Sequence, residues 1–165
     1  MNTARRPENF LLANAHEFIG QEVALTDWVH IDQVQTNVFG EVTRWPTWMH
    51  CDVERCERES PYGGTILHGF FMVALLTYFL EDAGLRPADG KQSLNYGTDK
   101  VRVLQPVLIG DGIRLRDRMT LLDVIDKGEG KRILKTGNVI EVEGMDEPVL
   151  YAEYLSYWFP KTEAA

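Results

Sequence analysis

The most uniform stretch of the chain is an apolar run at residues 66–80, with the sequence ILHGFFMVALLTYFL. Two acidic residues and then Gly84 follow it, which favours a helix that ends there. The run is shorter than the roughly 20 apolar residues that span a bilayer, and His68 lies inside it. A helix that is apolar on every side must be covered on every side, so we expect the rest of the chain to pack around it.

Most other hydrophobic residues fall in segments with the alternation and β-branched content of strands. Glycine-, proline- and aspartate-containing turns separate the later ones, which favours antiparallel neighbours. The predicted class is α+β, with an antiparallel sheet of about five or more strands wrapped around the long central hydrophobic helix. This arrangement is called the hot-dog fold, and an α+β roll with another strand order is the alternative. The predicted strands are residues 21–29, 93–104, 113–124, 132–142 and 149–159.

A short helix is predicted between the first strand and the apolar run. Asp32 is a candidate N-cap for it, because its side chain can accept a hydrogen bond from the first turn. Val34, Val38 and Val42 follow at a spacing of four, which places one apolar stripe along this helix.

Composition and charge indicate a single domain over residues 1–165, with ordinary globular values of 44% hydrophobic and 25% charged residues. Seventeen Lys and Arg against 25 Asp and Glu give a net charge of −8, which opposes binding to nucleic acid or anionic membranes. Two cysteines cannot form a disulfide framework, and the first residues lack the apolar segment of a signal peptide. We therefore expect a cytoplasmic protein with a small-molecule partner.

Four histidines are the side chains best suited to acid–base chemistry near neutral pH. His16 and His30 fall in a polar lead-in and at a strand end, where surface positions are expected. His68 lies in an apolar run, which favours a structural role. His50 lies in a predicted loop between two short helices, close to Trp48, and is the most open candidate for a chemical role.

Gly69 lies at the N-terminal end of the predicted long helix. Unpaired N–H groups there carry partial positive charge, and a glycine lets a carbonyl oxygen approach the backbone. An oxyanion-binding role and a role in close helix–sheet packing both fit this position. Cys51 and Cys56 lie near His50 in sequence, but their spacing matches no metal-ligand motif, so we expect no metal.

These segments also carry a resemblance to a known family. WMHCD at residues 48–52 and SPYGGTILHGF at residues 60–70 resemble the hydratase segment of the MaoC-like dehydratases. The sequences GQEV, DW and LNYGTDKVR are similar to the nodulation-protein-N branch of that group, and they occupy residues 20–23, 27–28 and 94–102. The similarity extends over nearly the whole chain, from about residue 18 to residue 158.

The resemblance implies a hot-dog dimer that binds an acyl thioester, usually of coenzyme A. It implies addition of water to a trans-2-enoyl thioester, or its removal from the (R)-3-hydroxy form, without a separate cofactor. The family histidine falls on His50, and the N–H that polarises the thioester carbonyl falls on Gly69. His68, Asn95 and Tyr96 fall at expected substrate-binding positions. The partner implied is a second copy or a hot-dog homologue.

The sequence departs from the family pattern at one decisive position. The catalytic Asp of the family lies five residues before the His, and here that position is Trp45, with Arg44 in place of the preceding glycine. An indole cannot take a proton from water. Because losing one member of an acid–base pair commonly costs on the order of 10²–10⁴ in rate, the usual hydratase chemistry cannot be assumed.

Three interpretations follow from this departure. In the first, the chain still acts on an enoyl or hydroxyacyl thioester, with a carboxylate such as Glu41, Asp52 or Asp99 assisting His50. In the second, a bulky or aromatic substrate stacks on Trp45 and Trp48 and undergoes a different reaction. In the third, the chain is a non-catalytic thioester-binding subunit that pairs with an active homologue.

Overall fold

The computed structural model describes residues 7–82 and 84–161. Its strands form one antiparallel sheet in the order β1-β4-β5-β6-β3, with β2 also pairing to β4. The prediction of an antiparallel sheet is confirmed, and each of the four later predicted strands overlaps an observed one. The strands are β1 (Glu22–Leu25), β2 (Val29–Ile31), β3 (Gly90–Val103), β4 (Ile113–Asp126), β5 (Arg132–Val142) and β6 (Leu150–Pro160).

The single strand predicted at residues 21–29 is instead two short strands, β1 and β2. Thr26 lies in the gap between them, and its hydroxyl accepts a hydrogen bond from the backbone N–H of Asp117 on β4. This side-chain contact stands beside the backbone bond from Thr26 to Asp117, so the chain stays attached to β4 while its strand pairing is interrupted.

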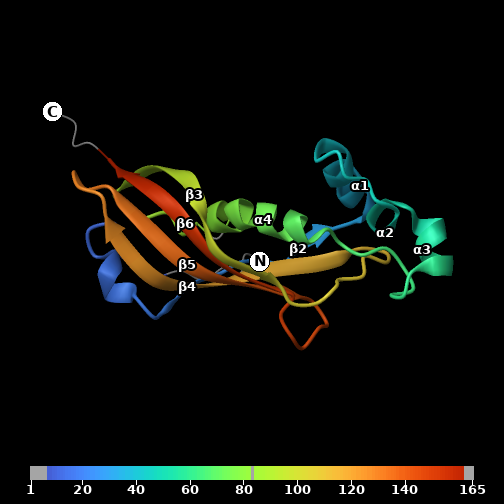
Figure 1. Cartoon of the computed structure of the whole chain (residues 1–165). Helices are drawn as coiled ribbons and strands as arrows, with labels where there is room; N and C mark the ends of the chain where they lie inside the picture. The colour runs from blue at the N-terminus through green and yellow to red at the C-terminus, as the bar shows by residue number, and fades with distance from the viewer. Residues whose placement is uncertain (1–6, 83, 162–165) are drawn as a thin grey trace.

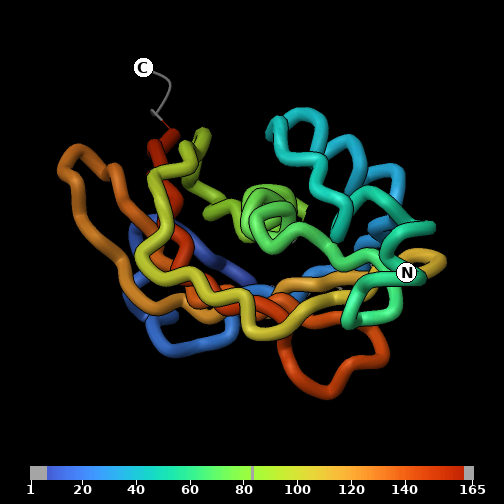
Figure 2. Tube along the Cα trace, turned by 45° about the vertical axis from the view of Figure 1, so that its right-hand side comes forward, coloured from blue at the N-terminus to red at the C-terminus, as the bar shows by residue number. Residues whose placement is uncertain are grey.

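The long helix α4 (Gly69–Asp82) lies in the concave face of the curved sheet, as the hot-dog architecture requires (Figures 1 and 2). Met72, Leu76 and Phe79 are buried in the core against the sheet. The expectation that the chain covers this helix on all sides is wrong, because Phe70 and Tyr78 on its outer face are exposed. The sheet is a single layer and can cover only one side of α4.

A helical excursion, defined here as residues 32–68, lies beyond the N-terminal end of α4 (Figure 1). Its first helix begins at the predicted cap, where Asp32 and Gln35 form a reciprocal capping box. The valine stripe of this helix faces away from the core, whereas Thr36 and Gly40 are its buried residues. The helices of the excursion are α1 (Gln33–Val42), α2 (Trp48–Cys51) and α3 (Val53–Glu59).

A 3-10 helix, η1 (Ala15–Phe18), precedes β1. None of the helices in the described part of the chain is long and apolar enough to cross a membrane.

Candidate active site

Two hydrogen bonds fix His50, one to its ring and one to its backbone carbonyl. It lies in helix α2 rather than in the predicted loop, and its Nδ1 is 2.7 Å from the carbonyl oxygen of Ile66. Because a carbonyl can only accept a hydrogen bond, Nδ1 carries the proton, and Nε2 of the neutral ring is left as the basic nitrogen. The Gln33 side chain on α1 donates to the backbone carbonyl of His50 at 2.6 Å, which fixes α2 against α1.

His68 packs directly on His50, with ring centroids 3.8 Å apart. Its side chain is only 5% exposed, and its Nε2 has no hydrogen-bond partner among residues 7–82 and 84–161. Burial, and after it the neighbouring His50, lowers the pKa of His68 to about 4. The ring of His68 is therefore neutral at physiological pH.

Gly69 begins α4, so its backbone N–H has no acceptor within its own helix. A Cβ at this position would lie 2.8 Å from Cγ2 of Val103 on β3. The close approach of β3 explains why a side chain is excluded here, which supports the packing role. The lack of a side chain at Gly69 is also compatible with a carbonyl oxygen that approaches its N–H from a cavity.

Two cavities meet at His50 and Gly69, which line both of them. The first has a volume of about 520 Å³ and is completed by His68 and by Phe39, Thr43, Trp45 and Phe70. The second, of about 330 Å³, extends toward Tyr62, Gln105 and the end of β3. A substrate bound at His50 and at the N-terminus of α4 could thus extend into either cavity.

Trp45 lines the first cavity and does not fill it, since its side chain is 66% exposed. Its backbone N–H donates to the carbonyl of Gly40 at 2.8 Å, which closes the end of α1. Arg44 adopts a left-handed conformation with φ of 58°, a region that favours glycine, and so keeps the backbone turn in which the family has a glycine.

The three carboxylates considered as assistants to His50 are not among the residues described as lining either cavity. Asp52 accepts a hydrogen bond from the backbone N–H of Arg55 and caps α3. Asp99 pairs with Lys135 at 2.8 Å, and Glu41 is exposed on α1. Assistance to His50 by one of them stays a prediction.

Three of the residues expected to bind substrate lie outside the first cavity. The Trp48 ring packs beneath the Arg55 guanidinium, 4.4 Å from its centroid, as a loop-packing residue would. Asn95 accepts a hydrogen bond from the Tyr154 hydroxyl, and Tyr96 is exposed on β3. The single chain brings Trp45, His50, His68 and Gly69 together, and a substrate role for the other three stays a prediction.

Sequence reasoning missed Phe39, Thr43 and Phe70. Phe39 and Thr43 are four residues apart and therefore share a face of the helical turn at the end of α1. Phe70 directly follows Gly69, so its place at the cavity was accessible once Gly69 was singled out.

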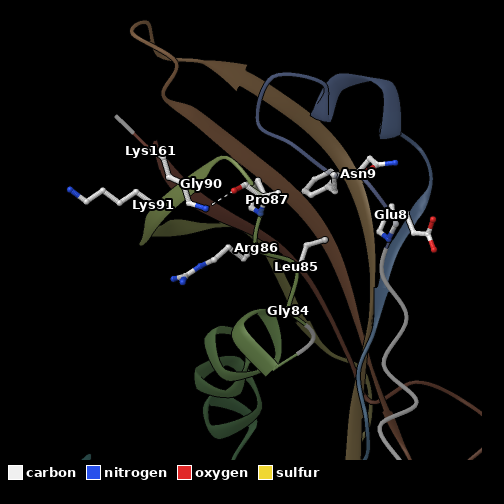
Figure 3. A pocket seen from close by; sticks show the side chains of 12 residues that line it. Glu8, Asn9, Gly84, Leu85, Arg86, Pro87, Gly90, Lys91 and Lys161 are labelled. Carbon is white, nitrogen blue, oxygen red and sulfur yellow. Dashed lines mark hydrogen bonds between the residues drawn. The ribbon is translucent and has the colours of Figure 1, made fainter. Parts of the chain in front are cut away.

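A larger cavity, of about 990 Å³, lies at the other end of α4 (Figure 3). It is formed by residues 7–10, 84–88, 90–91 and 161 and contains no histidine or cysteine. Arg86 and Lys91 extend away from Glu8 and Asn9 in Figure 3, so these charges do not converge on one point. No cluster of three metal-binding side chains occurs among residues 7–82 and 84–161.

Comparison with known families decides the relationship of this chain. The family described as "MaoC like domain" matches residues 14–143. The chain belongs to the MaoC-like dehydratase family. This MaoC-like chain is 32% identical over 145 residues to Nodulation protein N of Rhizobium leguminosarum bv. viciae, covering 88% of this chain and 89% of the relative. The predicted resemblance to the family and to its nodulation-protein-N branch is confirmed.

A second relative of the MaoC-like chain is 3-hydroxyacyl-thioester dehydratase Z of Mycobacterium tuberculosis, 37% identical over 134 residues. The match covers 81% of this chain and 86% of that protein. Among solved structures, the unliganded R-hydratase PhaJ1 from Pseudomonas aeruginosa superposes with a TM-score of 0.71 at 17% identity, over 100% of this chain and 95% of that one. This likeness confirms the hot-dog fold.

Proposed function

We propose that this chain binds an acyl thioester where the two cavities meet and catalyses hydratase or dehydratase chemistry on it. His50 is the acid–base group and the Gly69 N–H is the oxyanion donor. The observation that carries the proposal is that His50, whose Nδ1 is hydrogen-bonded to the Ile66 carbonyl, and Gly69 at the N-terminus of α4 line both cavities. The relationship to a 3-hydroxyacyl-thioester dehydratase supports the substrate class.

The proposed reaction needs no cofactor, because coenzyme A enters only as the carrier of the acyl group. Nε2 of His50 takes a proton from water while the water oxygen bonds to C3 of a trans-2-enoyl thioester. The electron pair of the double bond moves toward the thioester carbonyl, whose developing negative charge accepts a hydrogen bond from Gly69 N–H. His50 then returns the proton to C2, and dehydration follows the same steps in reverse. One oxyanion donor is commonly worth about 10²–10³ in rate.

A second candidate reaction follows from the lack of a described carboxylate in either cavity. Migration of a double bond in the acyl group needs only one acid–base group, because one imidazole can remove a proton and deliver it to another carbon. The aromatic walls of the first cavity favour a bulky substrate for such a reaction. A non-catalytic thioester-binding subunit is the third candidate, and failure of both reactions with intact binding would favour it.

The deciding experiment follows the loss of the enoyl-thioester absorbance band with a short and a long trans-2-enoyl-CoA. We expect turnover by the protein and its loss in His50→Gln, which keeps a polar side chain without a basic nitrogen. A His50→Gln variant as active as the original protein would contradict the proposed role of His50. A folded protein that binds but does not convert either thioester would contradict the hydratase proposal.

We also propose a dimer, with a second copy or a hot-dog homologue as the partner. Within the described residues β3 pairs only with β6, so its other edge is open for pairing. Leu94 and Tyr96 on β3, and Tyr78 on α4, are exposed large hydrophobic residues that a partner would cover. Sedimentation at twice the chain mass of 18.8 kDa is expected, and a monomer at micromolar concentration would contradict the proposal.

A further inference from the structure

The first cavity is built almost entirely from rings. Five of its seven described lining residues carry an aromatic or imidazole ring, and Thr43 and Gly69 are the other two. The Thr43 hydroxyl already donates to the carbonyl of Phe39 at 2.7 Å. No charged side chain is among these seven residues. The cavity therefore offers flat apolar surfaces and few groups that could pair with a polar substituent.

Three of the lining rings contact one another in series and form the ring wall of the cavity. Phe39 lies 5.2 Å from His68 with the ring planes tilted by 56°, and His68 stacks on His50 at 3.8 Å. Phe71, which is not a lining residue, stacks on Phe39 with centroids 4.8 Å apart and planes 6° apart. Because each ring is packed against the next, the ring wall is held in place without a ligand, and a rigid ring then loses less entropy on binding to it than a flexible chain does.

The mouth of the cavity has two further rings that have little covering them in the single chain. Trp45 is 66% exposed and Phe70 is 78% exposed, and both line the cavity. Large exposed apolar side chains beside a cavity are typical of ligand-binding surfaces. Rings gain most from other rings, because their faces and edges carry complementary partial charges.

We infer that the acyl group of the substrate carries a planar apolar ring, which binds between the ring wall and the side chains of Trp45 and Phe70. A cavity of about 150 Å³ is enough to hold benzene, so about 520 Å³ accommodates an aryl group with room for a larger ring system. The inference rests on the proposed function, since the thioester is assigned to the meeting point at His50 and Gly69. Trp48 has no part in it, because its ring is occupied by Arg55.

The test compares two saturated thioesters that cannot be hydrated and have equal numbers of acyl carbons: 3-phenylpropanoyl-CoA and nonanoyl-CoA. Calorimetric titration of the full chain gives the two dissociation constants. We expect the phenyl compound to bind about tenfold more tightly, from the stacking that the alkyl chain cannot make. Trp45→Leu and Phe70→Leu should each remove most of this preference. Trp28→Leu is the matched control and should keep it, because Trp28 lines neither cavity and the Arg116 guanidinium lies over its ring.

Each result has a distinct meaning. Equal binding of the two thioesters, or a preference that survives Trp45→Leu, would overturn the aryl assignment and leave the proposed function standing. Binding of neither thioester by the folded protein would overturn both. Circular dichroism of each variant separates a lost preference from a lost fold, and Phe70→Leu gives an independent measurement if Trp45→Leu does not fold.

Discussion

The imidazole rings of His50 and His68 stack with their centroids 3.8 Å apart and their planes 29° apart. Both rings belong to the helical excursion, His50 in α2 and His68 as the last residue before Gly69, so the contact ties α2 to the start of α4. His68 cannot share a charge with His50 at neutral pH, since its own pKa is lowered to about 4, chiefly by burial. Its contribution is the position of the His50 ring.

Replacing His68 should separate positioning from polarity. His68→Ala removes the stacked ring, so we expect kcat to fall at least about tenfold with a smaller change in KM. His68→Phe keeps a ring and removes the unpartnered Nε2, so it should retain kcat and raise the free energy of unfolding by about 1 kcal/mol. Steady-state kinetics and urea unfolding measure both. Equal losses of kcat in the two variants would show that the ring alone is not what matters.

Trp45→Asp should increase the rate of enoyl-thioester hydration. The change places a carboxylate on the wall of the cavity that His50 lines, where it can share the water's proton. We expect a gain of at least about tenfold, since a second acid–base group is commonly worth about 10²–10⁴. Trp45→Asn is the control of equal size without a negative charge. A gain of the same size in both variants would attribute the effect to the removed indole.

Gly69→Ala should impair both the fold and the reaction. Its added methyl would lie 2.8 Å from Cγ2 of Val103, and overpacking of this kind costs about 1–3 kcal/mol. Combining it with Val103→Ala removes the clash and should restore the unfolding midpoint. The methyl still obstructs a carbonyl oxygen, so turnover should stay low in the double variant compared with Val103→Ala alone. Full recovery of activity would leave Gly69 with a packing role only.

Asp117 should lower the stability of the fold as the pH rises from 5 to 7, whereas His68, whose pKa is lowered to about 4, acts in the opposite direction up to about pH 6.5. Burial raises the pKa of Asp117 from 3.8 to about 7, although the side chain accepts a hydrogen bond from Asn138. The folded state therefore binds a proton that the unfolded state has lost. This stabilisation is complete below pH 4 and disappears as the pH passes 7, with an upper limit of about 4 kcal/mol.

Urea unfolding at pH 5 and pH 8 measures the effect of Asp117. Asp117→Asn cannot titrate, so the change in the free energy of unfolding from pH 5 to pH 8 should be more positive in this variant than in the original protein, whatever its absolute stability. An unchanged difference would assign the pH dependence to other groups.

The sheet and the central helix were predictable because their signals are local. The alternation in residues 132–142 and the glycine-containing turns around it predict β5, and the uninterrupted apolar run predicts α4. The cap at Asp32 was predictable for the same reason, since the capping bond spans three residues.

The surroundings of these elements were not predictable, because a pattern does not say what covers an apolar residue. Val38 and Phe70 look like core residues in sequence, yet both are exposed in the chain. Gly40 is buried, and its neighbours leave little room for a side chain. A Cβ there would lie 3.0 Å from Sγ of Cys51 and 3.3 Å from Nε2 of His68. These neighbours are distant in sequence, so the ring wall of the cavity appears only once the chain is folded.

The proposed base and the proposed oxyanion donor belong to different structural units. His50 lies in the excursion, whose helices contact one another more than they contact the sheet, whereas Gly69 begins the helix that the sheet holds. Substitutions within residues 32–66 can thus change the substrate and the reaction while the sheet and α4 keep their sequence and structure. The catalytic repertoire of such a chain can diversify faster than its architecture.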